Sequence, residues 1–537
     1  MTNCSIPILD HPENLKEKQF VLEKLAKCNH LNHIKQLQAF LITLGHSQTQ
    51  FYAFKLVRCS TLALANLPHA RRIFDHLCSP NVYVFAAMIT AYASQCNYQS
   101  CFELYRDMLR RGSPRPNHFV YPQVLKSCVL DCYATGLVHT QIVKSGFGSH
   151  PVVQTALVNC YSRFSSDVRA ARQVFDEMCQ KNVVSWTAMI SGYTRIGEID
   201  NAVVLFEKMP ERDVPSWNAV ISGYMQNGMF SEAISLFKRM LFLLQEGQDH
   251  NRPNQVTAAC VLSACGHSGM LQLGRWIHAY VYRNGLGPDS FVSNALVDMY
   301  GKCGNLKQAK SMFNMTTQKC LTSWNSMINC YALHGQSKDA ISVFERMIVC
   351  GGDVPDEITF MALLNACTHG RLVEEGIAYF DLMTKKYGIK PQIEHYGCLI
   401  DLLARAGQFD EAMGIVRGME MEPDEVVWGS LLNGCKIYGC TDLAEFALHK
   451  LIEINPHNGG YDSLLANTYG ELGQWDEVQK VRRMLKDRNA YKTPGCSWIE
   501  INEQVCQFYS ADKTHPRTEE IYQILESLVC FLSFRSS

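Results

Sequence analysis

Residues 184–209 read VSWTAMISGYTRIGEIDNAVVLFEKM, and this stretch contains the pattern of a helical hairpin. Trp186, Ile190 and Tyr193 are spaced by four and then three residues, which places them on one face of a helix. Gly197 follows this run and is a typical helix-stop residue. The first half of the stretch therefore predicts an amphipathic helix that ends in a tight turn.

A second helix is predicted after this turn, and its pattern recurs along the chain. Ala202, Phe206 and Met209 repeat the spacing of four and three. Copies of this triplet begin at residues 171, 202, 233 and 340, and weaker copies begin at 70, 101, 309 and 412. The steps 171 to 202 and 202 to 233 are both 31 residues. One hairpin cannot bury its apolar stripe alone, so this period predicts an all-α fold, a right-handed α-solenoid superhelix of stacked helix–turn–helix repeats.

Composition limits the classes of protein that fit. The chain has 537 residues, of which 47% are hydrophobic and 19% charged, so wholesale disorder is excluded. The net charge of −1 argues against a polycation that coats nucleic acid, so any nucleic-acid site must be local. The 23 cysteines are scattered without any C-x-x-C pair, which is typical of a reduced, intracellular protein. No apolar run is long enough for a membrane span.

Three kinds of repeat alternate along the chain. Short repeats are like residues 290–320, repeats of about 35 residues are like 321–356, and long-type repeats are like 255–289, which contains VLSAC and GRWIH. This combination resembles a plant pentatricopeptide repeat (PPR) protein of the PLS class. The resemblance covers residues 18–510, and TPGCSWIE at 493–500 is similar to a hallmark of the same family.

The resemblance implies four parts: an N-terminal segment at 1–17, twelve PPR repeats of P, L and S types at 18–424, degenerate E1 and E2 hairpins at 425–492, and a C-terminal tail at 493–537. The chain is thus similar to the E subgroup, which has no DYW deaminase domain. Residues 241–251 are interpreted as an insertion that forms a loosened inter-helix loop. Residues 498–508 alternate apolar and polar side chains, which predicts a small β-hairpin near the C-terminus.

In this family each repeat is similar to a reader of one RNA base, and the reading side chains are the fifth and the last residue of the repeat. Apolar second residues, such as Val184 and Ile358, are expected to wedge bases apart. The implied readings are Thr155 with Asn182 for adenine, Thr187 with Asp213 for guanine, Asn218 with Asn254 for a pyrimidine, Asn294 with Cys320 for a pyrimidine by a weaker match, and Asn325 with Asp356 for uracil.

The implied footprint, 5′ to 3′, contains A-G-Y-N-Y-U. Early repeats have Leu22, Lys55 and Ala86 at the fifth position, and these are not code residues. The same polar residues also fit a purely structural role. Asn and Thr after a Trp are residues favoured at the N-cap of a helix, and Pro-Asp at the end of a repeat is typical of a turn.

Catalytic signatures are not found. The zinc-deaminase signature is H-x-E followed by P-C-x-x-C, and its only partial match is residues 11–13, which lies at the wrong end of the chain. No phosphate-binding loop or nucleophile elbow occurs, and His278 and His334 are interpreted as part of the repeat scaffold. The sequence therefore predicts a protein that is not an enzyme and has no cofactor and no metal site.

The leading hypothesis from the resemblance is a site-recognition factor for organellar C-to-U RNA editing. Its expected partners are single-stranded organellar RNA, a deaminase-domain protein acting in trans and organellar editing cofactor proteins. Alternatives are a factor for splicing, stability or translation of an organellar RNA, and a protein-interaction scaffold without RNA. The resemblance implies a mitochondrion, with a chloroplast as the alternative, although residues 1–17 contain three acidic residues and no arginine and so show no evident transit peptide.

Overall fold

The structure is a computed structural model of the chain. It describes residues 12–533 except 27, 29, 64–65, 129–130, 164–167, 248–250, 288–289, 351, 489, 491–494, 502–503, 510–512 and 514–515. The chain divides into two compact bodies. The N-terminal body contains residues 1–229 and 247–251, and the C-terminal body contains residues 230–246 and 252–537.

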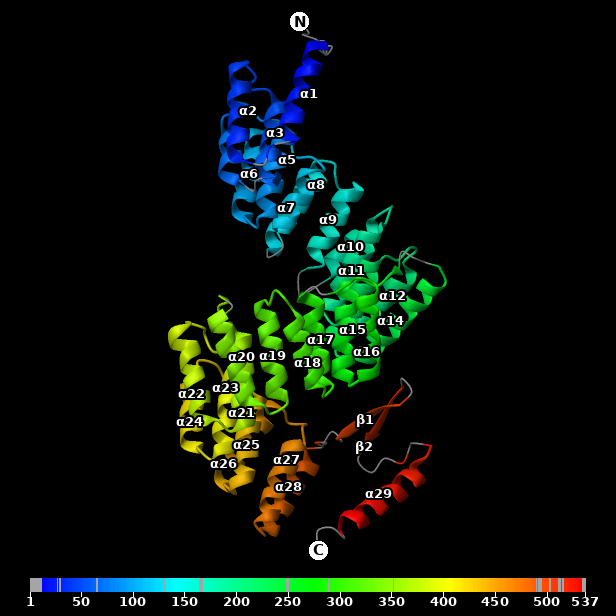
Figure 1. Cartoon of the computed structure of the whole chain (residues 1–537), viewed down its shortest axis with the longest axis vertical. Helices are drawn as coiled ribbons and strands as arrows, with labels where there is room; N and C mark the ends of the chain where they lie inside the picture. Colours follow the sequence, from blue (N-terminus) through cyan, green and yellow to red (C-terminus); the bar gives the residue numbers. More distant parts are fainter. Residues whose placement is uncertain are drawn as a thin grey trace. The chain divides into compact units, whose positions relative to one another are not determined.

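The N-terminal body consists of helices that follow one another as antiparallel hairpins (Figure 1). Its helices are α1 (Pro12–Ala26), α2 (Leu31–Thr43), α3 (Gln50–Arg58) with the short η1 (Cys59–Ala63), α4 (Leu67–Asp75), α5 (Val82–Ser94), α6 (Tyr98–Arg111), α7 (Val120–Ser127), α8 (Cys132–Lys144), α9 (Pro151–Tyr161), α10 (Arg169–Glu177), α11 (Val183–Arg195), α12 (Ile199–Lys208) and α13 (Val214–Gln226).

The C-terminal body continues the pattern and adds two strands. Its elements are α14 (Phe230–Gln245), α15 (Gln255–Ser268), α16 (Leu271–Arg283), α17 (Ser290–Lys302), α18 (Leu306–Met315), α19 (Leu321–Leu333), α20 (Ser337–Cys350), α21 (Glu357–Gly370), α22 (Val373–Asp381) with η3 (Leu382–Lys386), α23 (Ile393–Ala406), α24 (Phe409–Gly418), α25 (Glu425–Tyr438), α26 (Thr441–Ile454), α27 (Gly460–Glu471), α28 (Trp475–Asp487), β1 (Cys496–Ile501), β2 (Gln504–Tyr509) and α29 (Thr518–Ser533).

Each hairpin has a first helix and a second helix, and the first helices pack on one another within each body. Thus α5 contacts α3 and α7, and α19 contacts α17 and α21. The turn between α11 and α12 contains Gly197 with φ of +82°, a left-handed conformation that glycine adopts without a steric penalty. The predicted all-α hairpin-repeat fold is therefore confirmed.

The seam between consecutive hairpins is filled by the aromatic residues that recur in the sequence. Phe206 on α12 meets Trp217 on α13 edge to face, with ring centroids 4.9 Å apart. Phe313 on α18 meets Trp324 on α19 at 5.3 Å in the same way. Edge-to-face packing suits the quadrupoles of aromatic rings and adds to the burial of their apolar area. The alanines of the second helices, such as Ala202, are fully buried and allow neighbouring helices to approach closely.

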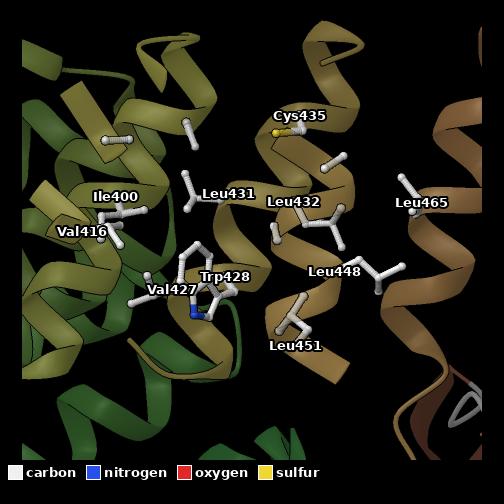
Figure 2. Packing of buried hydrophobic residues seen from close by; sticks show 14 of the residues in the cluster. Ile400, Val416, Val427, Trp428, Leu431, Leu432, Cys435, Leu448, Leu451 and Leu465 are labelled. Carbon is white, nitrogen blue, oxygen red and sulfur yellow. The ribbon is translucent and has the colours of Figure 1, made fainter. Parts of the chain in front are cut away.

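The apolar core of the C-terminal repeats runs on into the hairpins after residue 424. Figure 2 shows Val427, Trp428, Leu431 and Leu432 of α25 between Ile400 of α23 and the side chains of α26. A Cβ added to Gly434 on α25 would lie only 2.7 Å from Ala404 Cβ, so this glycine lets α25 approach α23. Residues of α25–α28 thus extend the same kind of core as the repeats before them.

One expectation about the connections is wrong. Residues 241–245, interpreted above as part of a loosened loop, extend α14, which ends at Gln245. The segment Leu-Phe-Leu-Leu-Gln contains no helix breaker, and Gly247 is the first glycine after it. Residues 248–250 of the insertion lie outside the described residues.

The predicted β-hairpin is confirmed. Strands β1 and β2 pair antiparallel, with Cys496 opposite Tyr509 and Ile501 opposite Gln504. Residues 493–494 of the TPGCSWIE hallmark and His11 of the partial deaminase match lie outside the described residues, as do residues 1–10 of the N-terminal segment.

Candidate functional site

In each repeat with a predicted reading pair, the last residue is the N-cap of the next first helix. Asn182, Asp213 and Asn254 each accept a hydrogen bond through Oδ1 from the backbone N–H three residues later, at 2.8, 2.9 and 3.0 Å. Asp356 caps α21 in the same way, through a 2.9 Å bond from the N–H of Thr359. These side chains satisfy N–H groups that the helix leaves without a partner, and so they have a structural role as well.

The fifth residues do not cap helices, so the capping explanation is wrong for them. Thr187 lies inside α11, and its hydroxyl donates to the carbonyl of Val183 at 2.9 Å. Thr155 lies inside α9, and its hydroxyl donates to the carbonyl of Pro151 at 2.8 Å. The extended backbone that an N-cap requires belongs to the residue just before each helix, and this residue is the last one of the preceding repeat.

Three of the predicted pairs are joined directly by hydrogen bonds. Asn182 Nδ2 donates to Thr155 Oγ1 at 3.1 Å. Asn325 Nδ2 donates to Asp356 Oδ1 at 3.0 Å. In the weaker pair, which is Asn294 with Cys320, the amide nitrogen lies 3.7 Å from the sulfur.

The Asn325 and Asp356 pair is held by a third residue. Thr359 Oγ1 lies 2.7 Å from Asn325 Oδ1 and 2.8 Å from Asp356 Oδ1. Asn325 is 7% exposed, so its orientation is set by the protein rather than by solvent. Its second amide hydrogen and its second Oδ1 lone pair remain available for a ligand. Such an amide, beside a carboxylate, can bond an edge that offers both a donor and an acceptor.

The remaining predicted residues are placed as follows. Asp213 also accepts the N-cap bond of α13 in a capping box with Ser216, and Thr187 keeps its bond within α11. Asn218 lies on α13 and is 9% exposed, and Asn254 is the exposed cap of α15. Partial burial raises the pKa of the Cys320 thiol, whereas hydrogen bonds from Ser323 and Asn294 lower it. The hydrogen bonds have the larger combined effect, so the pKa of Cys320 lies below its ordinary value.

Apolar side chains at the second position of the first helices are exposed. Val184 and Ile358, expected to wedge bases, are 58% and 51% exposed. The same exposure is shared by the second residues of six other repeats, which are Tyr83, Phe119, Val152, Val256, Phe291 and Val426. An exposed apolar residue at one fixed position of successive hairpins is unusual for a surface that contacts only water.

Basic residues in the last turn of several first helices were also missed. Arg195 ends α11, Lys302 ends α17, and Arg405 lies in the last turn of α23, each near the thirteenth position of its repeat. Lys126 and Arg163 border a hollow of about 290 Å³ that also contains Thr155. The recurrence of Lys or Arg at one position was the signal in the sequence. Positive charge therefore lies beside at least one predicted reading residue.

The histidines considered above belong to the scaffold. His278 Nδ1 lies 2.8 Å from the hydroxyl of Tyr300, and burial lowers the pKa of His278. His334 Nε2 lies 2.9 Å from the carbonyl of Gly301. Among the described residues, no group of three or more His, Cys, Asp or Glu side chains is arranged to hold a metal ion. Within the same residues, no helix is both long and apolar enough to cross a membrane.

The fold and the repeated polar pairs define a helical-repeat protein of the α-solenoid class. Models of the PPR repeat match residues 83–113, 184–214, 215–242, 291–319, 322–352, 358–387 and 394–422, and a model of the E motif matches residues 438–500. The chain is 56% identical over 519 residues to a pentatricopeptide repeat-containing protein of Arabidopsis thaliana, covering 96% of both chains. The chain belongs to the pentatricopeptide repeat family, and the modules matched in it are PPR repeats and an E motif.

A second Arabidopsis thaliana relative, named as chloroplastic/mitochondrial, is 35% identical over 529 residues, covering 95% of this chain and 76% of the relative. The crystal structure of the maize PPR protein PPR10 aligns with a TM-score of 0.48 at 16% identity, covering 90% of this chain and 89% of that one.

Proposed function

We propose that the chain binds one single-stranded RNA and reads its bases through the residue pairs Thr155/Asn182, Thr187/Asp213, Asn218/Asn254, Asn294/Cys320 and Asn325/Asp356. The observation that carries the proposal is the network of Asn325, Asp356 and Thr359, which fixes an amide and a carboxylate side by side. Uracil offers an acceptor and a donor on one edge, which complements this arrangement.

Two surface features support RNA over a protein ligand. The exposed second-position side chains, such as Val184 and Ile358, can pack against the faces of unstacked bases. Lys126 and Arg163, beside Thr155, suit a phosphate backbone. The basic residues beside Thr155 therefore favour RNA over a protein ligand.

The test is a binding titration with RNA that carries A-G-Y-N-Y-U and with a scrambled RNA. The Thr187→Asn variant faces Asp213 with an amide, as Asn325 faces Asp356, and is expected to change the preferred second base from guanine to uracil. Thr140→Asn is the matched control, because Thr140 donates to its own helix at 2.9 Å on the second helix α8. Equal binding of all RNAs by the unmodified chain would contradict base reading.

For the biological role, we propose recognition of a site for C-to-U editing in a plant organelle, with the deaminase supplied by a partner in trans. The E motif match at residues 438–500 supports editing over splicing, stability or translation. An organelle is supported by the name of the relative at 35% identity, and the mitochondrion is the organelle we propose first.

Sequencing of organellar transcripts from plants that lack the protein tests this role. One cytidine a few nucleotides 3′ of an A-G-Y-N-Y-U match should remain unedited, and the intact chain should restore its editing. A defect in splicing or transcript level, with all cytidines edited normally, would contradict the proposal.

A further inference from the structure

The turns that follow the first helices share one backbone feature. Their fifteenth residue, counted from the first residue of the hairpin, adopts the left-handed conformation. In eight of the described hairpins this residue is a glycine with φ between +66° and +82°: Gly197, Gly228, Gly269, Gly304, Gly335, Gly407, Gly439 and Gly473. Glycine has no Cβ, so it adopts this conformation without a steric penalty. The fold therefore favours glycine at this position.

Two turns depart from this rule. Among the described residues, two that are not glycine have a positive φ, which are Cys96 at +56° and Arg371 at +54°. Both occupy the fifteenth position. A Cβ atom disfavours this conformation, so both residues strain their turns. Strained residues that persist in a fold cluster at functional sites and ligand clamps. Because Arg371 also adds a positive charge, its turn is the stronger candidate for a ligand site.

Packing explains the residue before Arg371 but not Arg371 itself. A Cβ added to Gly370 would lie 2.3 Å from Oγ of Ser337, so a glycine at 370 lets the two turns approach closely. The left-handed residue of the turn is then Arg371, one position later. In another long-type repeat, 255–289, the corresponding residue is Gly269 with φ of +67°. The backbone of the turn at 371 therefore favours glycine over arginine.

Arg371 supplies a positive charge where the row of cations at the ends of the first helices is interrupted. Lys302 and Arg405 occupy the thirteenth position of their repeats. The two repeats between them have Leu333 and His369 at this position, and neither side chain carries a permanent positive charge. Arg371 follows two residues after His369. It thus places a guanidinium at the end of α21, which packs against α19 and α23.

The guanidinium of Arg371 is available to a ligand. Lys302 and Arg405 form ion pairs with Asp298 and Asp401, at 2.8 and 2.9 Å. Arg371 is exposed, and its side chain forms no hydrogen bond or ion pair with any residue that the structure describes. A guanidinium has five N–H donors in a planar fork, which matches the oxygens of a phosphate. An exposed, unpaired arginine at this edge therefore fits an anionic ligand.

We propose that Arg371 binds a backbone phosphate of the same RNA, directly 3′ of the base read by Asn325 and Asp356. This inference rests on the proposed function. The repeat 357–392 has Met361 at its fifth position, and this side chain has no N–H or O–H group to offer a base edge. The repeat thus contributes affinity through the backbone of the RNA, without preference among the four bases.

Three RNAs test the proposal. The first is A-G-Y-N-Y-U and ends at its uridine, the second carries two additional 3′ nucleotides, and the third carries two abasic 3′ nucleotides with the same phosphates. At about 50 mM salt, the second and third RNAs are expected to bind equally well, and roughly threefold to tenfold more tightly than the first, because one charged contact contributes a gain of this size.

Variants of Arg371 separate charge from strain. Arg371→Gln should remove the gain from the 3′ phosphates and reduce the slope of log affinity against log salt by about 0.7, the value for one phosphate contact. Arg371→Lys should retain part of the gain, since the charge remains. Arg371→Gly should also remove the gain, but it should raise the Tm by about 1–2 °C, because glycine adopts a positive φ without strain.

Arg417→Gln is the matched control. Arg417 is an exposed arginine in the last turn of the second helix α24, away from the ends of the first helices. This variant should bind all three RNAs as the unmodified chain does, with the same salt slope.

The outcomes distinguish this proposal from the proposed function. If the first RNA binds and neither extension adds affinity, or if the gain persists in both Arg371→Gln and Arg371→Gly, Arg371 is not a phosphate ligand. A gain from intact but not from abasic nucleotides would show a base contact and would also overturn the proposal. A lower Tm in Arg371→Gly with unchanged RNA binding would assign the arginine to α21, whose C-terminus favours a positive charge.

Two further results concern the reading code. A gain that depends on Arg371, without preference for A-G-Y-N-Y-U, would support the phosphate contact and refute the code alone. If no RNA binds, both proposals are wrong.

Discussion

The early hairpins around α5 and the later hairpins around α19 are built alike but present different chemistry. Both have a buried aromatic contact across the seam, between Phe74 and Phe85 at 4.9 Å and between Phe313 and Trp324 at 5.3 Å. At the fifth position of the first helix, however, the early hairpin has Ala86 and the later one has Asn325. The early surface is a hollow bordered by Phe54, Tyr83 and Phe119, and the later one is the hydrogen-bonded pair of Asn325 and Asp356.

One scaffold thus presents two kinds of exposed surface. The buried positions of the hairpin specify packing and are the same in both regions. The exposed second and fifth positions are not needed for packing, so they are free to carry either stacking surface or hydrogen-bonding groups.

The largest expected effect concerns the shared scaffold. Phe74→Ala and Phe313→Ala should each destabilise the protein by about 3–5 kcal/mol, because each removes a buried ring and leaves a cavity. Thermal and urea unfolding measure the loss. Phe119→Ala is the control, since Phe119 is exposed and should leave stability unchanged. A loss confined to one of the two regions would show that the scaffolds are not equivalent.

The next effect separates capping from reading. Asp356→Ala and Asp424→Ala each remove an N-cap, of α21 and α25, and should each cost about 1 kcal/mol of stability. Only Asp356 faces an amide, whereas the repeat that ends at Asp424 has Gly397 at its fifth position. Asp356→Ala should therefore weaken the preference for uracil at the last base of the footprint, and Asp424→Ala should not alter RNA binding. Equal RNA effects would refute the distinction.

A smaller effect depends on pH and should be common to both regions. His139 pairs with Tyr161 at 3.0 Å, as His278 pairs with Tyr300, and burial lowers the pKa of both histidines. The unfolded chain takes up protons near pH 6.5 before the folded chain does, so stability is full above that pH and falls below it.

Melting temperatures at pH 7.5 and 5.5 measure this fall. A single proton changes the free energy of unfolding by at most about 1.4 kcal/mol per pH unit, and each histidine should contribute less than this. His139→Gln and His278→Gln should each reduce the fall, and the exposed His457→Gln should not. If the loss of stability between pH 7.5 and pH 5.5 is unchanged in both variants, it comes from other titrating groups.

The smallest expected effect is on salt dependence. Arg163→Gln should reduce the slope of log affinity against log salt by about 0.7, the value for one phosphate contact to single-stranded RNA. Arg172→Gln is the matched control, because Arg172 lies on the second helix α10 in an exposed ion pair with Asp176. An unchanged slope in Arg163→Gln would remove this residue from the RNA surface.

Much of the fold could be predicted from the sequence because each hairpin is encoded locally. The spacing of Trp186, Ile190 and Tyr193 and the glycine after them specify a helix and its end without reference to distant residues. The insertion after Met240 was predicted less well, since its first residues continue α14. There the local helix propensity decided where α14 ends, and the repeat length did not indicate this position.

The candidate site was only partly accessible to sequence reasoning. The residue types at the fifth and last positions were predicted, but it was not predicted that only the last residues cap helices. Asn182 and Asp356 cap helices and also contact Thr155 and Asn325, across 27 and 31 residues of sequence. A cap can be recognised from neighbouring residues, whereas such a contact depends on how consecutive first helices pack.

The sequence by itself determined the repeat period and the helical hairpins, because these depend on spacings within one repeat. Only the tertiary structure decided that Thr359 fixes Asn325 and Asp356 together, and that Phe54, Tyr83 and Phe119 border one hollow. Asp356 and Thr359 are neighbours in the sequence, but Asn325 reaches them across 31 and 34 residues, and Phe54, Tyr83 and Phe119 come from three different hairpins. These longer contacts follow from the stacking of hairpins, which no single stretch of sequence encodes.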